Sequence, residues 1–372
     1  MPGRPTDKAV EPAARYSSVK YILAIVNIAY LLLLLLAFLA SGAHLKLSSL
    51  TGAIFANKTL ALLLYLSVLL AGYSILEIPL NFYRSYLLER RFGLSNQKIK
   101  SWVAEQLKAG VLSYIASAIA FGFLYYFLRR YPLHWWIIVA LLWLFFNLLL
   151  ARIFPLVILP LFFKYRRLDR EDLRGRIIKL AGKMRVPILD VFEIDFSKKT
   201  NKSNAAFIGW GKSRRVILTD TLSGNYSDDE IEAILAHEFA HYKLMHLIKL
   251  TALNFLGTIT TFYLIFKTGG YLAGFFGVRS LSDIASLAVI IFYLVAFDIV
   301  TRPLHNYFSR RMEKNADMLA LKITRGKDAF ISMMDKLASQ NLADRDPRRW
   351  IKFFFFDHPS IAERIELART FK

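Results

Sequence analysis

The 372-residue sequence contains no cysteine, which excludes disulfide bonds and any metal site built from thiolates. Acidic residues are also scarce, because 28 Asp and Glu accompany 49 Lys and Arg, for a formal net charge of +21. Histidine is rarer still, with seven in the whole chain. A transition-metal site in this protein therefore has to be built from a few histidines together with carboxylates.

Long apolar runs are abundant, and 55% of the residues are hydrophobic. About 20 apolar residues in a helix cross a bilayer core of roughly 30 Å, since each residue adds about 1.5 Å. The first run is too long for the apolar part of a signal peptide, so we expect it to remain as a membrane span. The sequence predicts six spans, at residues 21–40, 60–80, 109–128, 135–163, 247–266 and 282–300.

The basic residues are distributed unevenly between the segments that join these spans. Lys and Arg are frequent in 1–20, 83–108, 164–246 and 302–372, and sparse in the short loops on the opposite side. Cytoplasmic loops carry such an excess. We therefore expect a multi-pass integral membrane protein with both termini and the polar regions in the cytoplasm. Membrane lipid accounts for the positive charge, and no nucleic-acid partner is expected.

The polar regions divide the chain into four predicted parts. Residues 1–163 form an N-terminal membrane region with four spans, and 247–301 form two further spans. Between them, 164–246 is predicted as an α+β segment, with an amphipathic helix followed by strand-like runs at 190–196 and 214–220. A capping-box pattern at 227–230 opens a helix that has no evident stop before the fifth span. Residues 302–372 are predicted as a helical C-terminal segment.

Three of the seven histidines lie in the stretch AHEFAHYKLMH at 236–246. His237 and His241 are four residues apart, so on a helix both imidazoles point from the same face toward one ion. Glu238 lies beside them, as the base that removes a proton from an attacking water in H-E-x-x-H metalloproteases. The motif predicts one Zn²⁺ per chain and a zinc metalloendopeptidase that acts on peptide or protein substrates.

A catalytic zinc usually has a third protein ligand. His246 is close in sequence, but it lies nine residues after His237 and is turned away from the shared helical face. We favour Glu313 in the stretch SRRMEKNAD, with Asp317 one turn later orienting a ligand histidine through its second ring nitrogen. The alternative for this pair is a solvated charge on a cytoplasmic helix.

Six motifs occur in order along most of the chain: ERRFGLSNQ (89–97), FPLVILPLFFKYRRL (154–168), SNAAFIGWGKSRRVILTDTL (203–222), HEFAHYKLMH (237–246), SRRMEKNAD (309–317) and DHPSIAERI (357–365). In these six motifs and their order, the chain resembles the CAAX prenyl protease 1 family of integral-membrane zinc metalloproteases. The resemblance implies a mainly α fold, in which a polytopic membrane helical bundle carries a small α+β zincin-type domain on the cytoplasmic side.

The resemblance also implies roles for individual residues. It implies zinc on His237, His241 and Glu313, with Glu238 as the base. His358, together with Arg310 or Arg364, would lie near the scissile carbonyl and steady its developing charge. Asn204 and Ala205 would lie on an edge strand that holds the substrate backbone as an added strand.

Some features depart from this family or leave alternatives open. Eukaryotic members have seven spans and a large acidic insertion before the zinc helix, whereas this chain has six predicted spans and no such insertion.

The substrate would be a prenylated C-terminal tail or a damaged membrane protein, as for the HtpX-type proteases. A metal transporter is disfavoured because the best ligands lie outside the spans. Glu77 and Asp298 fall within apolar runs and would line a chamber or form structural pairs.

Overall fold

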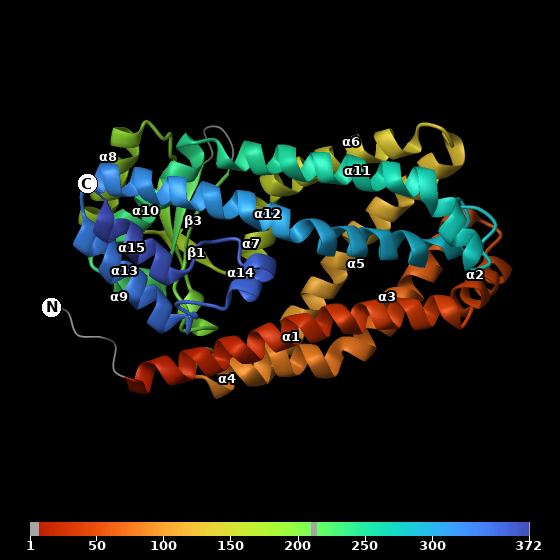
Figure 1. The fold of residues 1–372 in the computed structure, drawn as a ribbon, viewed down its shortest axis with the longest axis horizontal. Coiled ribbons are helices and arrows are strands. Elements are labelled where there is room, and N and C mark those ends of the chain that lie inside the picture. Colours follow the sequence, from red (N-terminus) through yellow and green to blue (C-terminus); the bar gives the residue numbers. More distant parts are fainter. Residues whose placement is uncertain (1–6, 210–213, 372) are drawn as a thin grey trace.

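The structure is a computed structural model that describes residues 7–209 and 214–371. Within these residues, six helical segments are long and apolar enough to cross a membrane. They lie side by side in an elongated bundle, with the short α2 (Ala43–Ile54) at the end farthest from the sheet (Figure 1). The segments are α1 (Asp7–Ala40), α3 (Lys58–Phe82) continued by α4 (Leu88–Arg91), α5 (Ile99–Arg130), α6 (Trp135–Ile153) continued by α7 (Leu159–Phe162), α11 (His246–Phe275) and α12 (Leu287–Thr324).

Large side chains pack together in the part of this bundle that is far from the sheet. Tyr65, Tyr125 and Leu287 are fully buried there beside Trp135 and Phe262. On the outside, large apolar residues are exposed on every long helix. A soluble protein rarely exposes so much apolar surface, whereas hydrocarbon solvates it without cost. The bundle is therefore the membrane region of a multi-pass integral membrane protein.

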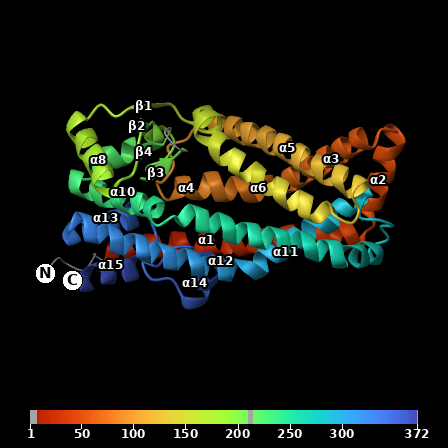
Figure 2. The same ribbon diagram turned by 90° about the horizontal axis from the view of Figure 1, so that it is seen from above.

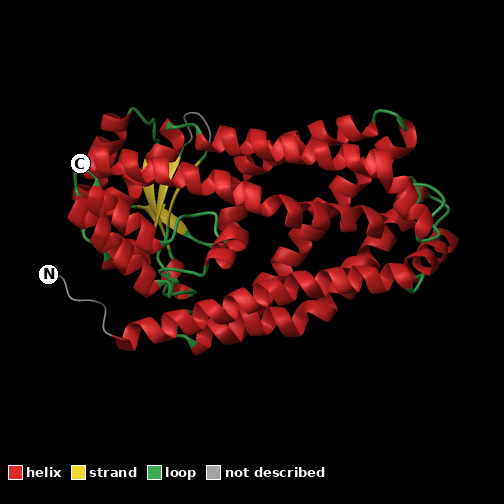
Figure 3. Cartoon of the chain, in the orientation of Figure 1, coloured by secondary structure: helices red, strands yellow, loops and turns green. Residues whose placement is uncertain are grey.

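A four-stranded sheet lies at the other end of the molecule (Figure 3). Its strands are β1 (Tyr165–Arg167), β2 (Asp190–Ile194), β3 (Ala205–Ile208) and β4 (Arg215–Thr219), in the order β1-β2-β4-β3. The central pair β2–β4 is parallel, and both outer pairs are antiparallel. The predicted runs at 190–196 and 214–220 correspond to β2 and β4. Strand β3 occupies one edge of the sheet.

Helices cover this sheet and share one apolar core with it, around Val191, Leu218, Phe239 and Phe330. Helix α10 is central to this end of the molecule and packs against α8, α12 and α13 (Figure 2). The helices are α8 (Glu171–Met184), α9 (Asp220–Asn225), α10 (Asp228–Lys243), α13 (Lys327–Gln340) and α15 (Ile361–Thr370). The short α14 (Arg349–Phe355) packs against α12 instead.

The start of α10 is fixed by its own first turn. Ser227 caps the helix through the backbone of Glu230, and the Glu230 carboxylate accepts a hydrogen bond from the Ser227 backbone, so the predicted capping box forms. The buried Glu230 carboxylate also accepts hydrogen bonds from Ser332 (2.6 Å) and Lys336 (2.7 Å) of α13. The helix that carries the H-E-x-x-H motif is thus tied to α13 at its first turn.

One expectation about helix continuity is wrong. Helix α10 does not run into the fifth span: it ends at Lys243, and Met245 adopts a left-handed conformation (φ 55°) before α11 begins. A left-handed residue cannot continue an α-helix. At the predicted limit of 301/302 between the last span and the C-terminal segment, α12 continues without a break from the membrane region to Thr324. Pro303 lies inside α12 without ending it. The expected irregularity at Pro155 and Pro160 is present as a π-helical turn, Phe154–Ile158, before α7.

Candidate active site

Two elements far apart in the sequence build the centre of the site. Helix α10 presents His237 and His241 from one face, and α12 presents Glu313 opposite them. The two Nε2 atoms lie 3.1 Å apart, and each is 3.2 Å from an oxygen of the Glu313 carboxylate. One ligand atom from each of the three residues lies within 4.8 Å of the other two.

These three side chains fit a metal ion. The Glu313 side chain is buried, and its Oε2 has no hydrogen bond although it lies close to the His237 ring. A buried carboxylate oxygen without a hydrogen bond is costly unless a cation shares its space. Two imidazoles and one carboxylate are a typical donor set for a catalytic Zn²⁺, with a fourth position left for substrate.

Asp317 and Arg364 support the His237 ring from behind. The fully buried Asp317 carboxylate accepts a hydrogen bond from Nδ1 of His237 (2.8 Å) and two from Arg364 (2.6 and 2.8 Å). Burial lowers the pKa of His237, but its hydrogen bonds to Asp317 and Glu313 outweigh burial and raise the pKa to about 9. A ring held by carboxylates in this way is more basic and hence a stronger metal ligand.

The Arg364 guanidinium is itself buried, and its charge is compensated locally. Burial disfavours the cation, but Asp317, and then Glu313 and Glu238, hold the pKa of Arg364 above its usual value. Glu238 is half-buried on α10, next to His237. The predicted base is therefore within electrostatic range of a fixed positive charge.

Sequence reasoning considered His246 only as a metal ligand and did not give it another role. In the structure the buried His246 ring lies behind His241, with the two Nδ1 atoms 3.0 Å apart. When Nε2 of His241 binds a metal, its Nδ1 carries the hydrogen and donates it to His246. His246 would then support His241 as Asp317 supports His237. The third histidine in the stretch AHEFAHYKLMH was the sequence signal that could have indicated this supporting role.

His358 reaches the same centre from the loop after α14. Its Nε2 lies 3.3 Å from Oε1 of Glu313, and its Nδ1 lies 2.7 Å from Asp357. Half of the His358 side chain is exposed, unlike the metal donors. Burial opposes the charged form of the ring, but the hydrogen bond to Asp357 and the proximity of Glu313 raise its pKa. His358 can therefore present a proton donor on the open side of the site.

Arg310 and Arg364, the two arginines named from the sequence, both form hydrogen bonds within the protein. Nη1 of Arg310 donates to the carbonyl oxygens of Lys352 (3.0 Å) and Phe356 (2.6 Å), which hold the end of α14 and the loop that carries His358. Arg364 is engaged by Asp317, as described above. Both residues therefore position other active-site groups in this structure.

Asn204 and Ala205 lie at the start of the edge strand β3, beside α10. The Asn204 carbonyl accepts a hydrogen bond from Thr219 of β4 (3.1 Å), so the alternation of an antiparallel pair turns the backbone of Ala205 and Phe207 to the outer edge. Phe207 packs against Phe239 of α10. This outer edge has no paired strand among the residues described.

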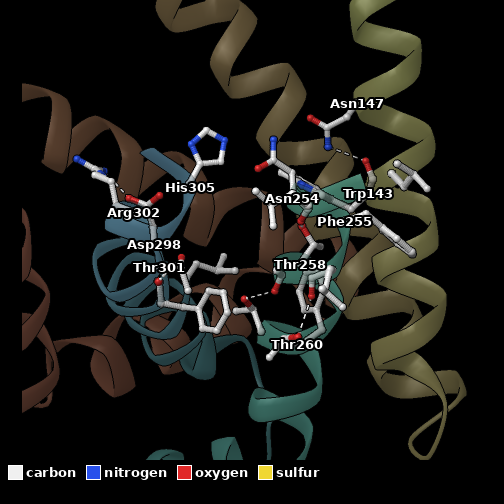
Figure 4. Close-up of a pocket in the computed structure, with 18 of the residues that line it drawn as sticks. Trp143, Asn147, Asn254, Phe255, Thr258, Thr260, Asp298, Thr301, Arg302 and His305 are labelled. Atoms are coloured by element: carbon white, nitrogen blue, oxygen red, sulfur yellow. Dashed lines mark hydrogen bonds and ion pairs between the residues drawn. The ribbon is translucent and has the colours of Figure 1, made fainter. Parts of the chain in front are cut away.

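The two acidic residues inside the spans differ. Glu77 pairs with Arg84 (3.4 Å) on the same helical segment. Of the two alternatives for Glu77, a structural ion pair or a place in the wall of a chamber, the structure shows the ion pair. Asp298 pairs with Arg302 and lines a cavity between α5, α6, α11 and α12 (Figure 4).

An H-E-x-x-H helix, a glutamate from a later helix and a small sheet, joined to a membrane bundle, define a membrane-embedded zinc metalloprotease. The model of Peptidase family M48 matches residues 167–372, and that described as "CAAX prenyl protease N-terminal, five membrane helices" matches residues 3–164. The first match covers more than half of the sequence. The chain belongs to peptidase family M48.

Relatives and a solved structure agree with this assignment. The chain is 28% identical to the uncharacterized metalloprotease YhfN of Bacillus subtilis, over 98% of this chain and 86% of that protein. It is 29% identical to CAAX prenyl protease 1 of Saccharomyces cerevisiae, over 82% of this chain and 71% of that protein. The crystal structure of S. mikatae Ste24p shares the fold, with a TM-score of 0.89 at 24% identity, over 98% of this chain and 90% of that one.

Proposed function

We propose that this metalloprotease trims the C-terminal tails of lipid-modified proteins at the cytoplasmic membrane surface. The observation that carries the proposal is the path of α12, which provides Glu313 at the metal centre and continues directly into the membrane bundle. A substrate anchored by a lipid would thus have its anchor in the bilayer and its scissile bond near the metal. The relatives named CAAX prenyl protease 1 support a prenyl group as that lipid.

The residues of the site would divide the hydrolysis between them. Zinc, when held by His237, His241 and Glu313, supplies Lewis-acid polarisation of the scissile carbonyl. Glu238 takes a proton from the attacking water and passes it to the leaving amine. His358 donates a hydrogen bond to the carbonyl oxygen as it gains negative charge.

The edge strand β3 would align the peptide. The outward carbonyl of Ala205 and the outward backbone groups of Phe207 can hold an extended substrate as an added antiparallel strand. The N–H of Ala205 already donates to the side-chain oxygen of Asn204 (2.9 Å), so Asn204 covers that position of the edge. In the proposal Arg310 and Arg364 act indirectly: Arg310 holds the loop of His358, and Arg364 holds Asp317.

The central test is the Glu238→Gln variant, compared with Glu232→Gln on the same helix. Glu232 is ion-paired to Arg176 and takes no part in the proposed reaction. We expect Glu238→Gln to bind wild-type amounts of zinc but to cleave a farnesylated peptide roughly 10²–10⁴-fold more slowly, the usual effect of losing a general base. Glu232→Gln should keep both properties. Normal cleavage by zinc-loaded Glu238→Gln would contradict the assigned role.

The proposed substrate class is tested separately with peptides that differ only in the lipid. A farnesylated peptide and its S-methyl counterpart are compared with the wild-type protein, and the farnesylated peptide should have the larger kcat/KM. Equal cleavage of both peptides would favour a membrane quality-control protease, which has no need of a lipid.

The proposed orientation can be tested because the chain has no cysteine of its own. A single cysteine at Lys179 of α8 should be protected from a membrane-impermeant maleimide in intact cells, because the active-site end is proposed to face the cytoplasm. A single cysteine at Leu133, in the turn between α5 and α6, should be labelled. The reverse pattern would refute the orientation.

A further inference from the structure

A cavity of about 1280 Å³ lies among α5, α6, α11 and α12 (Figure 4). It reaches the metal centre through Asp357, which lines the cavity and accepts a hydrogen bond from His358. The other nitrogen of that ring lies 3.3 Å from the Glu313 carboxylate. The cavity wall and the metal centre are thus joined through Asp357 and His358.

The character of the cavity wall changes along its length. Helices α11 and α12 run in opposite directions between the metal centre and the far end of the bundle, so sequence position gives the depth of each residue. Polar and apolar residues are mixed near the metal centre, where Leu253, Leu304 and Phe354 also line the wall, whereas the residues deeper in the bundle are mainly apolar. The near group includes Asn254, Arg302, His305, Asn306 and Asp357, and the far group includes Phe121, Leu124, Val139, Phe262 and Leu294.

Many polar groups of the wall are satisfied within their own helices. The hydroxyls of Thr258, Thr260 and Thr301 each donate to the carbonyl four residues earlier, at 2.8 Å. Asn147 donates to the carbonyl of Trp143 (2.7 Å) in the same way. Because these groups have partners already, they do not require water in the cavity, and the threonines can offer methyl groups to a ligand.

The near end offers hydrogen bonds, and its charges are paired. Asp298 forms an ion pair with Arg302, and Asp357 is paired with His358. Asn254 of α11 and His305 of α12 project toward the same space (Figure 4). Among the described residues, neither of these two side chains has a hydrogen-bond partner. Such an end suits the neutral amides of a peptide rather than the charged head group of a phospholipid.

We infer that this cavity receives the hydrocarbon chain attached to the substrate, with the chain in the apolar far end and the peptide at the near end. The inference rests on the proposed function and adds the place where the lipid binds. From Asn306 to Leu294 the wall follows α12 for about 18 Å at 1.5 Å per residue, so an extended chain of many carbons can lie along it. The continuity through Asp357 brings the bond next to the lipidated residue to the metal.

The first test narrows the cavity with Ala120→Phe on α5, a lining residue. Ala109→Phe, on an exposed surface of the same helix and outside the lining, is the matched control. The measurement is the ratio of kcat/KM for a farnesylated peptide to that for its S-methyl counterpart, with zinc-loaded full-length protein in lipid vesicles. We expect Ala120→Phe to lower this ratio at least tenfold and Ala109→Phe to leave it within twofold. An unchanged ratio in Ala120→Phe, or an equal fall in both variants, would overturn the inference.

A second measurement locates the chain directly and does not depend on a cavity variant that folds. A farnesylated peptide with a photoreactive group at the end of its lipid is bound to the Glu238→Gln protein, irradiated and mapped by mass spectrometry. Adducts on the far-group residues are expected. Adducts confined to the exposed outer surface would overturn the assignment. Labelling that disappears when phosphatidylcholine is added in excess would also overturn it, because a bilayer lipid would then be the occupant. Loss of cleavage of every peptide by the zinc-loaded wild type would instead refute the proposed function.

Discussion

The Asp317→Asn substitution separates two roles that the structure gives to one buried carboxylate. Asp317 orients His237 through a 2.8 Å hydrogen bond and compensates the buried charge of Arg364 through two hydrogen bonds. The amide keeps the shape of the side chain but removes its charge. The guanidinium then remains buried without its carboxylate, and breaking a buried pair in this way costs about 3–5 kcal/mol.

The loss of metal affinity has a different cause. An amide holds the His237 ring less firmly than a carboxylate and makes it less basic, and changes of this kind cost about 10–100-fold in metal affinity. Zinc affinity is measured by competition with a chromophoric chelator, and stability by thermal unfolding of the metal-free protein in detergent. Both quantities should fall in Asp317→Asn.

A double variant distinguishes the two roles. Asp317→Asn combined with Arg364→Gln removes the unpaired cation, so much of the lost stability should return. The zinc affinity should stay low, because the carboxylate behind His237 is still missing. Zinc affinity equal to the wild type in Asp317→Asn would refute the orienting role. A double variant as unstable as the single one would refute the charge argument.

Three further predictions concern the metal support and the zinc helix. His246→Ala should lower zinc affinity about 10–100-fold in the same competition assay, whereas His134→Ala, at the start of α6, should not. Ser227→Ala should destabilise α10 by about 1 kcal/mol, and an unchanged thermal unfolding curve would contradict this. Burial alone would raise the pKa of Glu230, but hydrogen bonds from Lys336 and other neighbours lower it. The ionised Glu230 carboxylate therefore stabilises the folded protein at a pH above the pKa of Glu230 in the unfolded chain, and this stabilisation is lost as the pH falls through the lower pKa of the folded protein. In Glu230→Gln the free energy of unfolding should thus depend less on pH on the acid side.

Local spacing explains why most of the fold and the core of the site could be predicted. Hydrophobic runs of membrane-spanning length predicted six spans, and the i, i+4 spacing in HEFAH placed two imidazoles on one face. The capping pattern at Ser227 predicted the start of α10. Each of these signals depends on residues within one or two helical turns, where the periodicity of the helix is sufficient information.

The features that sequence reasoning missed depend on backbone geometry or on distant contacts. The left-handed conformation of Met245 turns the chain so that His246 comes back beside His241, which helical periodicity cannot anticipate. Strand β1 has three residues, too few for an alternating pattern. The hydrogen bonds from Arg310 to the carbonyls of Lys352 in α14 and Phe356 just after it join segments more than 40 residues apart. The cavity arises only when four spans are packed together.

The continuity of α12 has a mechanical consequence. Its 38 residues form a rod about 57 Å long, which reaches from the far side of the bundle past the metal. A bilayer that is thicker or thinner than the bundle changes the tilt of such a helix. Since Glu313 lies on the part of α12 that packs against α10, a tilt of the membrane portion would act on the contact between the two helices that carry the metal donors. Bilayer thickness thus becomes a physical variable that acts on the geometry of the metal centre.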